Sequence, residues 1–577
     1  MKLILSYLKR YKFLFLIDLI SVFGFALVEL GIPTIIAQMI DVGVLNQDKS
    51  YIYQMGLYIA LISFIGVAGT ILLGFCSAKI STSITRDIRN DIFDKAQQYS
   101  HSEFNKFGIS SLITRTNNDA FQIQLFVNVL LRTALMTPVM FIVSFIMTIR
   151  TSLDLTLIIA ATIPFIVLGV LWVAKISEPI SENQQKSLDY LNRISRENLT
   201  GIRVIRSFNN DDHETKRFDG ANVDYTTYSK RIFKLMSYTQ PIFFMLMNLA
   251  GLAIFWVAAT KINVGALQVG KLVAFMEYLF HAMFSMMLFC TVFMMYPRAR
   301  VSALRIKELL NQDITIKNPQ QPINEISNDI TLRFNNVSFV YSEGEEPVLK
   351  DCSFKANKGE TIAFIGSTGS GKSTLINLIP RFYDVSCGSI TINDIDVRDY
   401  DLTSLRDKIG FISQKAILFS GSIEDNIRFG KEDASFEEIE KASRIAQAYD
   451  FIMEKEHGFQ EHISENATNL SGGQKQRLSI ARALVRKPQI YIFDDSFSAL
   501  DFRTDAILRK ELKKETKNSI VMVVAQRISS IMDANQIVVL NEGNIVGIGT
   551  HQELLKNCEI YYEIAASQLS KEELGYV

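Results

Sequence analysis

The sequence has few cysteines, and they form no pattern that indicates a covalent or metal framework. Five cysteines occur in 577 residues, and no two of them form a Cys-x-x-Cys pair. They are Cys76, Cys290, Cys352, Cys387 and Cys558. An odd number at wide spacing gives no indication of a disulfide framework or a zinc site. We expect the cysteines to be small buried hydrophobic residues.

The sequence also lacks an excess of charge of either sign. Lys and Arg number 60, Asp and Glu also number 60, and neither a basic tail nor a block of like charges is present. A net charge of zero argues neither for nor against binding to nucleic acid. Without a basic segment, nothing in the sequence predicts a nucleic-acid partner. Partners must therefore be inferred from motifs.

A cleavable leader is missing as well. Lys2, Lys9, Arg10 and Lys12 precede an apolar run, as they would in a secretory signal. The run from Phe13 to about Ile40 is too long for such a segment, and no small-residue cleavage pattern follows it. It is long enough to span a bilayer, which takes about 20 residues.

What the chain does have is a large apolar content, concentrated in its first 300 residues. Of all residues 48% are apolar, 39 are Phe, and the mean hydropathy is +0.16. Further candidate spans lie near 53–80, 120–149, 154–174, 235–260 and 271–296. The sequence therefore predicts an α-helical membrane domain of six transmembrane helices over residues 1–310.

The loops between these spans alternate in charge and length. The segments after the second and fourth spans are long and basic, and the three intervening loops are short with few Lys or Arg. By the positive-inside tendency, we expect a multi-pass protein of the cell membrane with both termini and both long segments in the cytoplasm. Both segments carry apolar residues at helical spacing, namely Ile84, Ile88, Ile92 and Leu191, Ile194, Leu199, Ile202. We therefore expect the spanning helices to continue into the cytoplasm.

Several ionisable residues fall inside the spans, where charge is costly and usually faces a cavity or a partner. They are Asp18, Glu29, Arg132, Glu277 and His281. We interpret them as candidates for a substrate path, with snorkelling at an interface as the alternative for Asp18 and Arg132. The last span is dense in Met and Phe, which suits a broad apolar site or, alternatively, lipid-facing packing.

The stretch from Ala363 to Thr374 reads as an apolar strand, a glycine-rich turn and the start of a helix. Its pattern Gly-x-x-x-x-Gly-Lys-Ser predicts backbone N–H groups that cradle phosphate at a helix N-terminus. The predicted cradle consists of Gly366, Ser367, Thr368, Gly369, Ser370, Gly371, Lys372, Ser373 and Thr374. Lys372 would reach the β- and γ-phosphates and Ser373 would bind Mg²⁺. An ordinary glycine-rich turn is the alternative.

Two later segments support a nucleotide site. A polar linker at 311–328 leads to a β-rich region at 329–577, which we expect to form an α/β phosphate-loop ATPase domain. There, Ile490–Asp495 reads as a buried strand that ends in two carboxylates, and Asp494 is the predicted Mg²⁺ ligand. Between the phosphate loop and this strand lies Leu470-Ser471-Gly472-Gly473-Gln474, which opens a helix and offers a second anion site.

The order and spacing of these elements resemble the ATP-binding-cassette (ABC) transporters, and Leu470–Gln474 matches their signature letter for letter. The resemblance covers the whole chain and is to a half-transporter of the multidrug-exporter type, a type IV ABC exporter. It implies ATP and Mg²⁺ as cofactors. It also assigns Gln414 to the Q-loop near the metal, Ser498–Asp501 to the D-loop and Tyr341 to adenine stacking. Phe107–Asp119 and a segment around Phe208–Phe218 resemble the coupling regions of such exporters.

Two positions depart from the family pattern. Where the family has a Glu that polarises the attacking water, this chain has Asp495, and where it has a switch histidine, this chain has Gln526. The shorter carboxylate and the amide that cannot hold a proton predict slow hydrolysis at the site that uses this phosphate loop. The segment before the signature keeps only Glu465 of the family's Gly-Glu-Arg-Gly.

By the resemblance, each ATP is held between the phosphate loop of one cassette and the signature of another, so a second half-transporter is implied. The combination of an intact signature with Asp495 and Gln526 resembles the degenerate subunit of a heterodimeric exporter of hydrophobic or amphipathic compounds. The alternatives are a homodimeric exporter of lipids or peptides and a nucleotide-gated regulatory membrane subunit. No protease-like domain precedes the first span, which disfavours a peptide-processing exporter.

Overall fold

The computed structural model describes residues 1–341 and 344–570 of the chain, which divides into two compact units. The first unit, called the helical unit, comprises residues 1–97 and 110–312. The second, called the sheet unit, comprises residues 98–109 and the chain from 313 onward. The short segment 98–109 therefore packs with residues that follow it by more than 200 positions.

The helical unit contains six stretches of helix, within the described residues, that are long and apolar enough to cross a membrane. They are Lys2–Val44, Lys49–Gln97, Ile109–Thr151, Leu153–Ser207, Asp211–Asn263 and Val269–Phe289. This confirms the predicted six-helix membrane fold. The helix of 55 residues, Leu153–Ser207, is about 80 Å long at 1.5 Å per residue, well beyond a bilayer core of about 30 Å.

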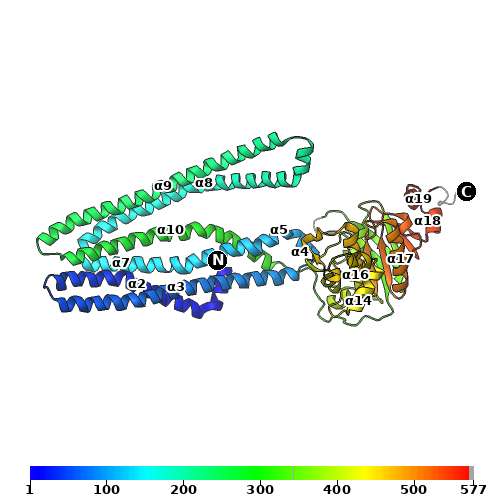
Figure 1. Cartoon of the computed structure of the whole chain (residues 1–577), viewed down its shortest axis with the longest axis horizontal. Coiled ribbons are helices and arrows are strands. Elements are labelled where there is room, and N and C mark those ends of the chain that lie inside the picture. The colour runs from blue at the N-terminus through cyan, green and yellow to red at the C-terminus, as the bar shows by residue number, and fades with distance from the viewer. Residues whose placement is uncertain (342–343, 571–577) are drawn as a thin grey trace. The chain divides into compact units, whose positions relative to one another are not determined.

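Most of these stretches are continuous α-helices, and two contain π-helical turns. The α-helices are α1 (Lys2–Leu8), α2 (Lys12–Gln38), α3 (Lys49–Gln97), α5 (Ile109–Thr114), α6 (Ala120–Val129), α7 (Met136–Thr151), α8 (Leu153–Ser207), α9 (Asp211–Asn263) and α10 (Val269–Asn311). The π-helical turns are η2 (Met39–Val44), η3 (Arg115–Asp119) and η4 (Leu130–Ala134). In Figure 1, α8 and α9 run side by side as one long hairpin, and α2 lies beside α3.

The two segments with apolar residues at helical spacing are helical, as predicted: α3 and α8 run through them without a break. Ile84, Ile88 and Ile92 on α3 are buried. On α8, Ile194 is buried, whereas Leu199 is 77% exposed and Ile202 36% exposed. The apolar side chains of the two segments therefore differ in how far this chain covers them.

The ionisable residues of the spans lie in different environments. Asp18 of α2 is fully buried and accepts a hydrogen bond from Ser77 of α3 at 2.8 Å. This contradicts the snorkelling alternative for Asp18. Arg132 is exposed, in the π-helical turn η4. His281 of α10 lies 3.4 Å from Glu29 of α2, measured from Nε2 to Oε2.

The sheet unit is built around a mostly parallel sheet with the strand order β12-β11-β3-β10-β9-β6. Its strands are β3 (Thr361–Gly366), β6 (Ile409–Ile412), β9 (Ile490–Asp494), β10 (Ile520–Val524), β11 (Gln536–Asn541) and the antiparallel edge strand β12 (Asn544–Gly549). Every residue of β9 and β10 is buried, because helices and a second sheet cover the two faces. The carboxyl ends of β3, β9 and β10 therefore lie next to one another.

A second sheet, ordered β2-β1-β4-β5, packs on the first through one hydrophobic core. Its strands are β1 (Thr331–Phe339), β2 (Leu349–Asn357), β4 (Cys387–Ile392) and β5 (Ile395–Asp396), and a small separate pair is formed by β7 (Gly421–Ser422) and β8 (His462–Ile463). The helices are α4 (His101–Phe107), α11 (Lys372–Leu378), α12 (Leu402–Asp407), α13 (Ile423–Arg428), α14 (Phe436–Ile445), α15 (Tyr449–Met453), α16 (Gly472–Val485), α17 (Phe502–Glu515), α18 (His551–Asn557) and α19 (Glu559–Ala566).

The cysteine prediction holds for three residues and fails for one. Cys76, Cys352 and Cys558 are buried. Cys387, the first residue of β4, is exposed. The side chain of Cys290 lies outside the described residues.

Candidate functional site

The segment between β3 and α11 is a tight loop that only glycine can form at two positions. Gly366 has φ +155°, and a Cβ there would come within 2.0 Å of the carbonyl oxygen of Leu540. Gly371, the residue that caps α11, has φ +97°, and its Cβ would lie 2.8 Å from Leu349. This geometry leaves residues 367–369 exposed at the carboxyl edge of the sheet, where the N-terminus of α11 favours an anion.

Lys372 places a positive charge inside this loop. Its ammonium donates to the carbonyl oxygens of Gly366 at 2.9 Å and Ser367 at 2.7 Å, and to the hydroxyl of Ser370 at 3.2 Å. Burial lowers the pKa of Lys372, and the nearby carboxylates of Asp495 and Asp494 oppose that effect. A half-buried ammonium ringed by carbonyl groups would exchange these neutral partners for phosphate oxygens, which pair more strongly with a cation.

Two oxygen ligands suited to Mg²⁺ stand side by side at the same edge. Ser373 at the start of α11 donates from Oγ to Oδ1 of Asp494, the last residue of β9, at 2.9 Å. Burial raises the pKa of Asp494, while the Ser373 hydrogen bond acts in the other direction. No cluster of three or more His, Cys, Asp or Glu side chains fit for a metal occurs in the part of the chain that is described. A cation held by Ser373 and Asp494 would take its remaining ligands from phosphate and water, as Mg²⁺ commonly does.

Asp495, Gln414 and Gln526 meet at a single carboxylate oxygen. Oδ2 of Asp495 accepts from Nε2 of Gln526 at 2.8 Å and from Nε2 of Gln414 at 3.2 Å. Asp495 itself has φ +46°, which turns the chain sharply after β9. Burial raises the pKa of Asp495, and the hydrogen bond from Gln414 counteracts this. Gln414 thus points its amide at Asp495 and not at the predicted ligand Asp494.

The signature segment forms a capped helix start. Ser471 caps α16: its hydroxyl accepts from the N–H of Gln474 at 3.3 Å, and Gln474 accepts from the N–H of Ser471 at 2.9 Å. Gly472 and Gly473 form the first turn, which is exposed in part, so N–H groups of this turn are open to an anion. Among the described residues no hydrogen bond joins this segment to the loop at 366–374. One cassette therefore presents the two anion sites separately.

Tyr341 lies beside the loop, where its ring packs edge-on against two aromatic neighbours. Its hydroxyl is 3.0 Å from Oγ1 of Thr374, and its ring centroid is 4.8 Å from Phe339 and 5.3 Å from Tyr383. The position is consistent with a stacking surface for a base whose phosphates occupy the loop. Sequence reasoning did not find Tyr383, because a lone aromatic residue in a loop carries no signal.

Helix α4 docks on the sheet unit at this same place. His101 stacks on Phe382 with ring centroids 4.5 Å apart, and Asn105 donates to the hydroxyl of Tyr383 at 3.4 Å. Packing of the imidazole against the unit lowers the pKa of His101, and the charge of Arg406 acts in the same direction. The segment that packs with the sheet unit, residues 98–109, overlaps the coupling region predicted at Phe107–Asp119 only at its start, and the coupling role of that region stays a prediction.

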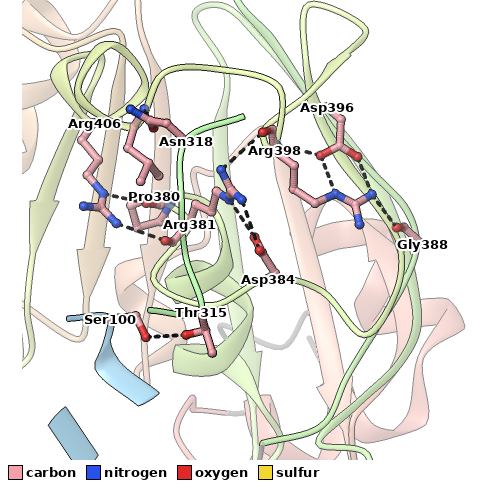
Figure 2. Close-up of polar contacts among 11 residues, drawn as sticks. Ser100, Thr315, Asn318, Pro380, Arg381, Asp384, Gly388, Asp396, Arg398 and Arg406 are labelled. Carbon is pink, nitrogen blue, oxygen red and sulfur yellow. Dashed lines mark hydrogen bonds and ion pairs between the residues drawn. The ribbon is translucent and has the colours of Figure 1, made fainter. Parts of the chain in front are cut away.

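Glu103 of α4 ties the helix to the chain that follows α10. It is 2% exposed, and its carboxylate accepts from Thr315 at 3.1 Å (N–H) and 2.6 Å (hydroxyl) and from the N–H of Ser100 at 2.7 Å. Figure 2 shows the Ser100 and Thr315 hydroxyls facing each other, 3.0 Å apart. Burial raises the pKa of Glu103, but the hydrogen bonds outweigh it and the pKa lies below the ordinary value.

The Phe382–Tyr383 platform under α4 is held by arginines. Arg406 donates to the carbonyls of Pro380 and Arg381, each at 3.1 Å, and buried Arg381 forms a two-pronged ion pair with Asp384 at 2.7 and 3.2 Å (Figure 2). The loop from 380 to 384 is thus fixed from both ends. This set of contacts positions α4 next to Tyr341.

A cavity of about 560 Å³ lies between α9 and α10 in the helical unit. Its lining includes Met247, Asn248, Phe255, Met276, Glu277 and Phe280. Glu277 is the only ionisable group among the described residues that line it. His281 instead pairs with Glu29, so the predicted path residues do not form one cluster.

Two regions of the chain match known families. Residues 15–288 match the family described as ABC transporter transmembrane region, and residues 349–498 match the family described as ABC transporter. An uncharacterized ABC transporter ATP-binding protein of Bacillus subtilis is 38% identical over 568 residues, which cover 98% of each chain. A similarly named protein of Mycobacterium tuberculosis is 34% identical over 99% of this chain and 98% of its own length.

A third relative, from Staphylococcus aureus, carries the provisional name multidrug export ATP-binding/permease protein. It is 32% identical over 577 residues, which cover 98% of this chain and 99% of the relative. All three similarities extend over both the helical and the sheet unit.

Proposed function

The chain belongs to the ATP-binding-cassette transporter family, and from this premise we propose that it forms one half of a heterodimeric exporter of hydrophobic and amphipathic compounds. ATP-driven export follows from the membrane region and the ATPase domain together. The finer proposal concerns the division of labour: this chain binds ATP at a slow site and supplies its signature to a fast one.

The observation that carries the proposal is the state of Asp495. One of its carboxylate oxygens is engaged by the amides of both Gln414 and Gln526. The two amides fix the orientation of this carboxylate, and because an Asp is one methylene shorter than the family's Glu, its oxygens lie farther from the water that a base must polarise. A misplacement of about 1 Å can cost about 100-fold in rate. The neutral Gln526 amide can neither carry a proton nor supply positive charge to the transition state.

The main contacts for the phosphate chain and Mg²⁺ come from other residues than these two. The glycine-constrained loop, Lys372 and the Ser373–Asp494 pair keep every feature required for phosphate and Mg²⁺. Slow hydrolysis combined with intact binding would hold this site closed for many turnovers of the other. Conformational closure, which ATP drives, would then be reset mainly by the partner.

The signature supports a role in a second, competent site. Its capped helix start presents exposed N–H groups that the chain's own loop does not use. A partner chain that supplies the Glu and His would complete that site. A homodimer in which Asp495 and Gln526 work slowly at both sites is the competing arrangement.

The cavity between α9 and α10 supports an apolar substrate. Thioether and aromatic side chains repack around ligands of different shape, which suits broad specificity. Uphill, ATP-dependent accumulation of a lipophilic dye in inverted vesicles that contain the pair would establish pumping. Dye equilibration without accumulation would instead favour a nucleotide-gated regulatory subunit.

The central test compares ATPase rates of the purified chain alone and in complex with a companion half-transporter that carries Glu and His. We expect little turnover alone and rapid turnover by the pair. In the pair, Ser471→Ala should abolish turnover, whereas Asp495→Asn should cost much less. Substantial turnover by the isolated chain that Asp495→Asn abolishes would overturn the proposal, as would equal losses from the two variants in the pair.

A further inference from the structure

A residue near the C-terminal end of the described chain holds the backbone on both sides of Arg527. Gln568 follows α19, and its side-chain Nε2 donates to the carbonyl oxygen of Gln526 at 2.9 Å. Its Oε1 accepts from the N–H of Ile528 at 2.8 Å. One amide thus satisfies a donor and an acceptor two residues apart, as a neighbouring strand would. We call residues 526–528 the switch segment.

Most of the switch segment lies outside regular structure. β10 ends at Val524, and the 3₁₀ turn Ile528–Ser530 begins with the last residue of the segment, so Gln526 and Arg527 belong to no helix or strand. A carbonyl and an N–H in such a segment would bond to water and leave the peptide planes free to rotate. The Gln568 amide removes this freedom on both sides of Arg527, including at the backbone carbonyl of Gln526.

Gln526 in turn is the residue that contacts Asp495. Its side chain donates to Oδ2 of Asp495 at 2.8 Å, beside the phosphate loop. The contacts therefore run from Gln568 through the backbone of Gln526 to the Asp495 carboxylate. A rotation of the switch segment would move the Gln526 amide away from that oxygen, since the side chain follows its own peptide planes.

Gln568 is well anchored for this purpose. Tyr561 and Ala565 of α19 are fully buried in the same hydrophobic core as Ile528, and Leu569 packs against it. The hydroxyl of Tyr561 is also 2.7 Å from Nδ1 of His551. The end of α19 and the switch segment thus share one rigid support, so the Gln568 amide is positioned before any nucleotide binds.

We infer that Gln568 is a positioning residue of the nucleotide site, which holds the switch segment so that Gln526 faces Asp495 and the γ-phosphate position. The inference rests on the proposed function, in which Gln526 and Asp495 lie at the γ-phosphate. Its consequence is specific: Gln568 should affect the response to ATP and not the response to ADP.

The experiment measures dissociation constants of the Mg²⁺ complexes of ADP and of a non-hydrolysable ATP analogue on the full-length chain. Gln568→Met keeps the length of the side chain and removes both hydrogen bonds. We expect it to weaken analogue binding about fivefold, the effect of one net hydrogen bond, with ADP affinity and the melting temperature unchanged. Ser567→Ala is the matched control, because that exposed hydroxyl donates to the carbonyl oxygen of Ile564 one turn earlier, and it should change neither constant.

Gln568→Glu gives a signature that loss of packing cannot produce. A carboxylate can accept from the N–H of Ile528 but repels the carbonyl of Gln526, whereas a protonated carboxyl can donate to that carbonyl. Relative to the unsubstituted chain, analogue affinity should be weak at pH 7.5 and recover as the pH falls toward about 5, near the range in which Glu protonates. Affinity equally weak at both pH values would overturn the inference.

A double-mutant cycle with Gln526→Ala completes the test. Gln568→Met should add no further loss in the Gln526→Ala chain, because both act through the same side chain. Additive losses, or equal losses for ADP and the analogue, would reduce Gln568 to a structural role. If Gln526→Ala alone leaves analogue affinity unchanged, the proposed role of Gln526 fails and the inference with it. If Gln526→Ala weakens analogue binding and Gln568→Met does not, the inference about Gln568 is overturned while the proposed role of Gln526 stands.

Discussion

The side-chain amide of Asn105 donates to the hydroxyl of Tyr383 at 3.4 Å, and the same tyrosine ring packs edge-on against Tyr341 at 5.3 Å. A helix from the first 110 residues is therefore two contacts away from the expected adenine-stacking ring. Binding of a base on Tyr341 would restrict Tyr383, and through it the docking of α4.

Substitution at Tyr383 should separate nucleotide binding from α4 docking. Tyr383→Ala removes an aromatic pair worth about 0.5–1.5 kcal/mol, so the KM for ATP of the proposed heterodimeric pair should rise roughly two- to tenfold. Tyr383→Phe keeps the ring and should retain the KM but lose part of the substrate-stimulated rate, as should Asn105→Ala. A KM for Tyr383→Ala equal to that of the unsubstituted pair would contradict a link from Tyr341 through Tyr383 to α4.

Removal of the Glu103 carboxylate should loosen α4. Glu103→Ala removes the buried carboxylate that accepts from Ser100 and Thr315, at a cost of about 1.5–3 kcal/mol for a hydrogen bond to a charged group. Hydrogen exchange at residues 98–109 should accelerate while exchange in β9 and β10 stays slow. Glu103→Gln retains an acceptor and should show a smaller change, whereas unchanged exchange in Glu103→Ala would count against this role.

The docking of α4 should weaken in mild acid because of His101. Its pKa in the docked state lies below the ordinary value of about 6.5, so the undocked state takes up a proton first as the pH falls. The free energy of docking is thus fully present above pH 6.5 and decreases below it. Hydrogen exchange of α4, corrected for the intrinsic effect of pH, should accelerate from pH 7.5 to 5.5. In His101→Phe, which stacks without titrating, this acceleration should be reduced, and an unchanged profile would refute the assignment.

The site proposed to be slow should gain activity when both departures are reversed. Asp495→Glu combined with Gln526→His restores a carboxylate of family length and a group able to carry a proton. We expect ATPase turnover of the isolated chain to rise at least tenfold. This is less than the rate loss of about 100-fold that a misplaced carboxylate can cause. Lys372→Ala in the same background is the control for turnover by this loop. A rate that stays at the level of the unsubstituted chain would show that the two residues are not what limits it.

Glu277 should discriminate among substrates by charge. It is the only ionisable residue among the described residues that line the α9–α10 cavity, and a carboxylate in apolar surroundings attracts a cation strongly. Glu277→Gln should reduce transport of a lipophilic cationic dye several-fold and leave a neutral dye of similar size unaffected. Asn248→Ala, in the same lining, tests whether any change in the cavity has the same effect. Parallel losses for both dyes would contradict a charge-based role.

The sequence identified those features whose physics is local. Six long apolar helices, the glycine-rich cradle and the strand ending at Asp494 each depend on contiguous residues, so periodicity and motif were enough to predict them. The sequence did not identify features that depend on contacts between distant residues. The α4 residues that stack on Phe382 and bond to Tyr383 lie before the segment Phe107–Asp119 that the sequence singled out.

The amino-acid sequence by itself determined that this protein crosses a membrane and carries a phosphate cradle, because hydrophobic length and glycine backbone freedom act over neighbouring residues. Only the tertiary structure decided that Gln568 forms hydrogen bonds with the backbone of the switch segment. The same holds for the bonds of Gln414 and Gln526 to one oxygen of Asp495 and for the bond between Glu103 and Thr315. Each of these contacts joins residues 31 to 212 positions apart. Hydrogen bonds of this kind depend on packing that brings distant side chains within about 3 Å, and no spacing in the sequence encodes that distance.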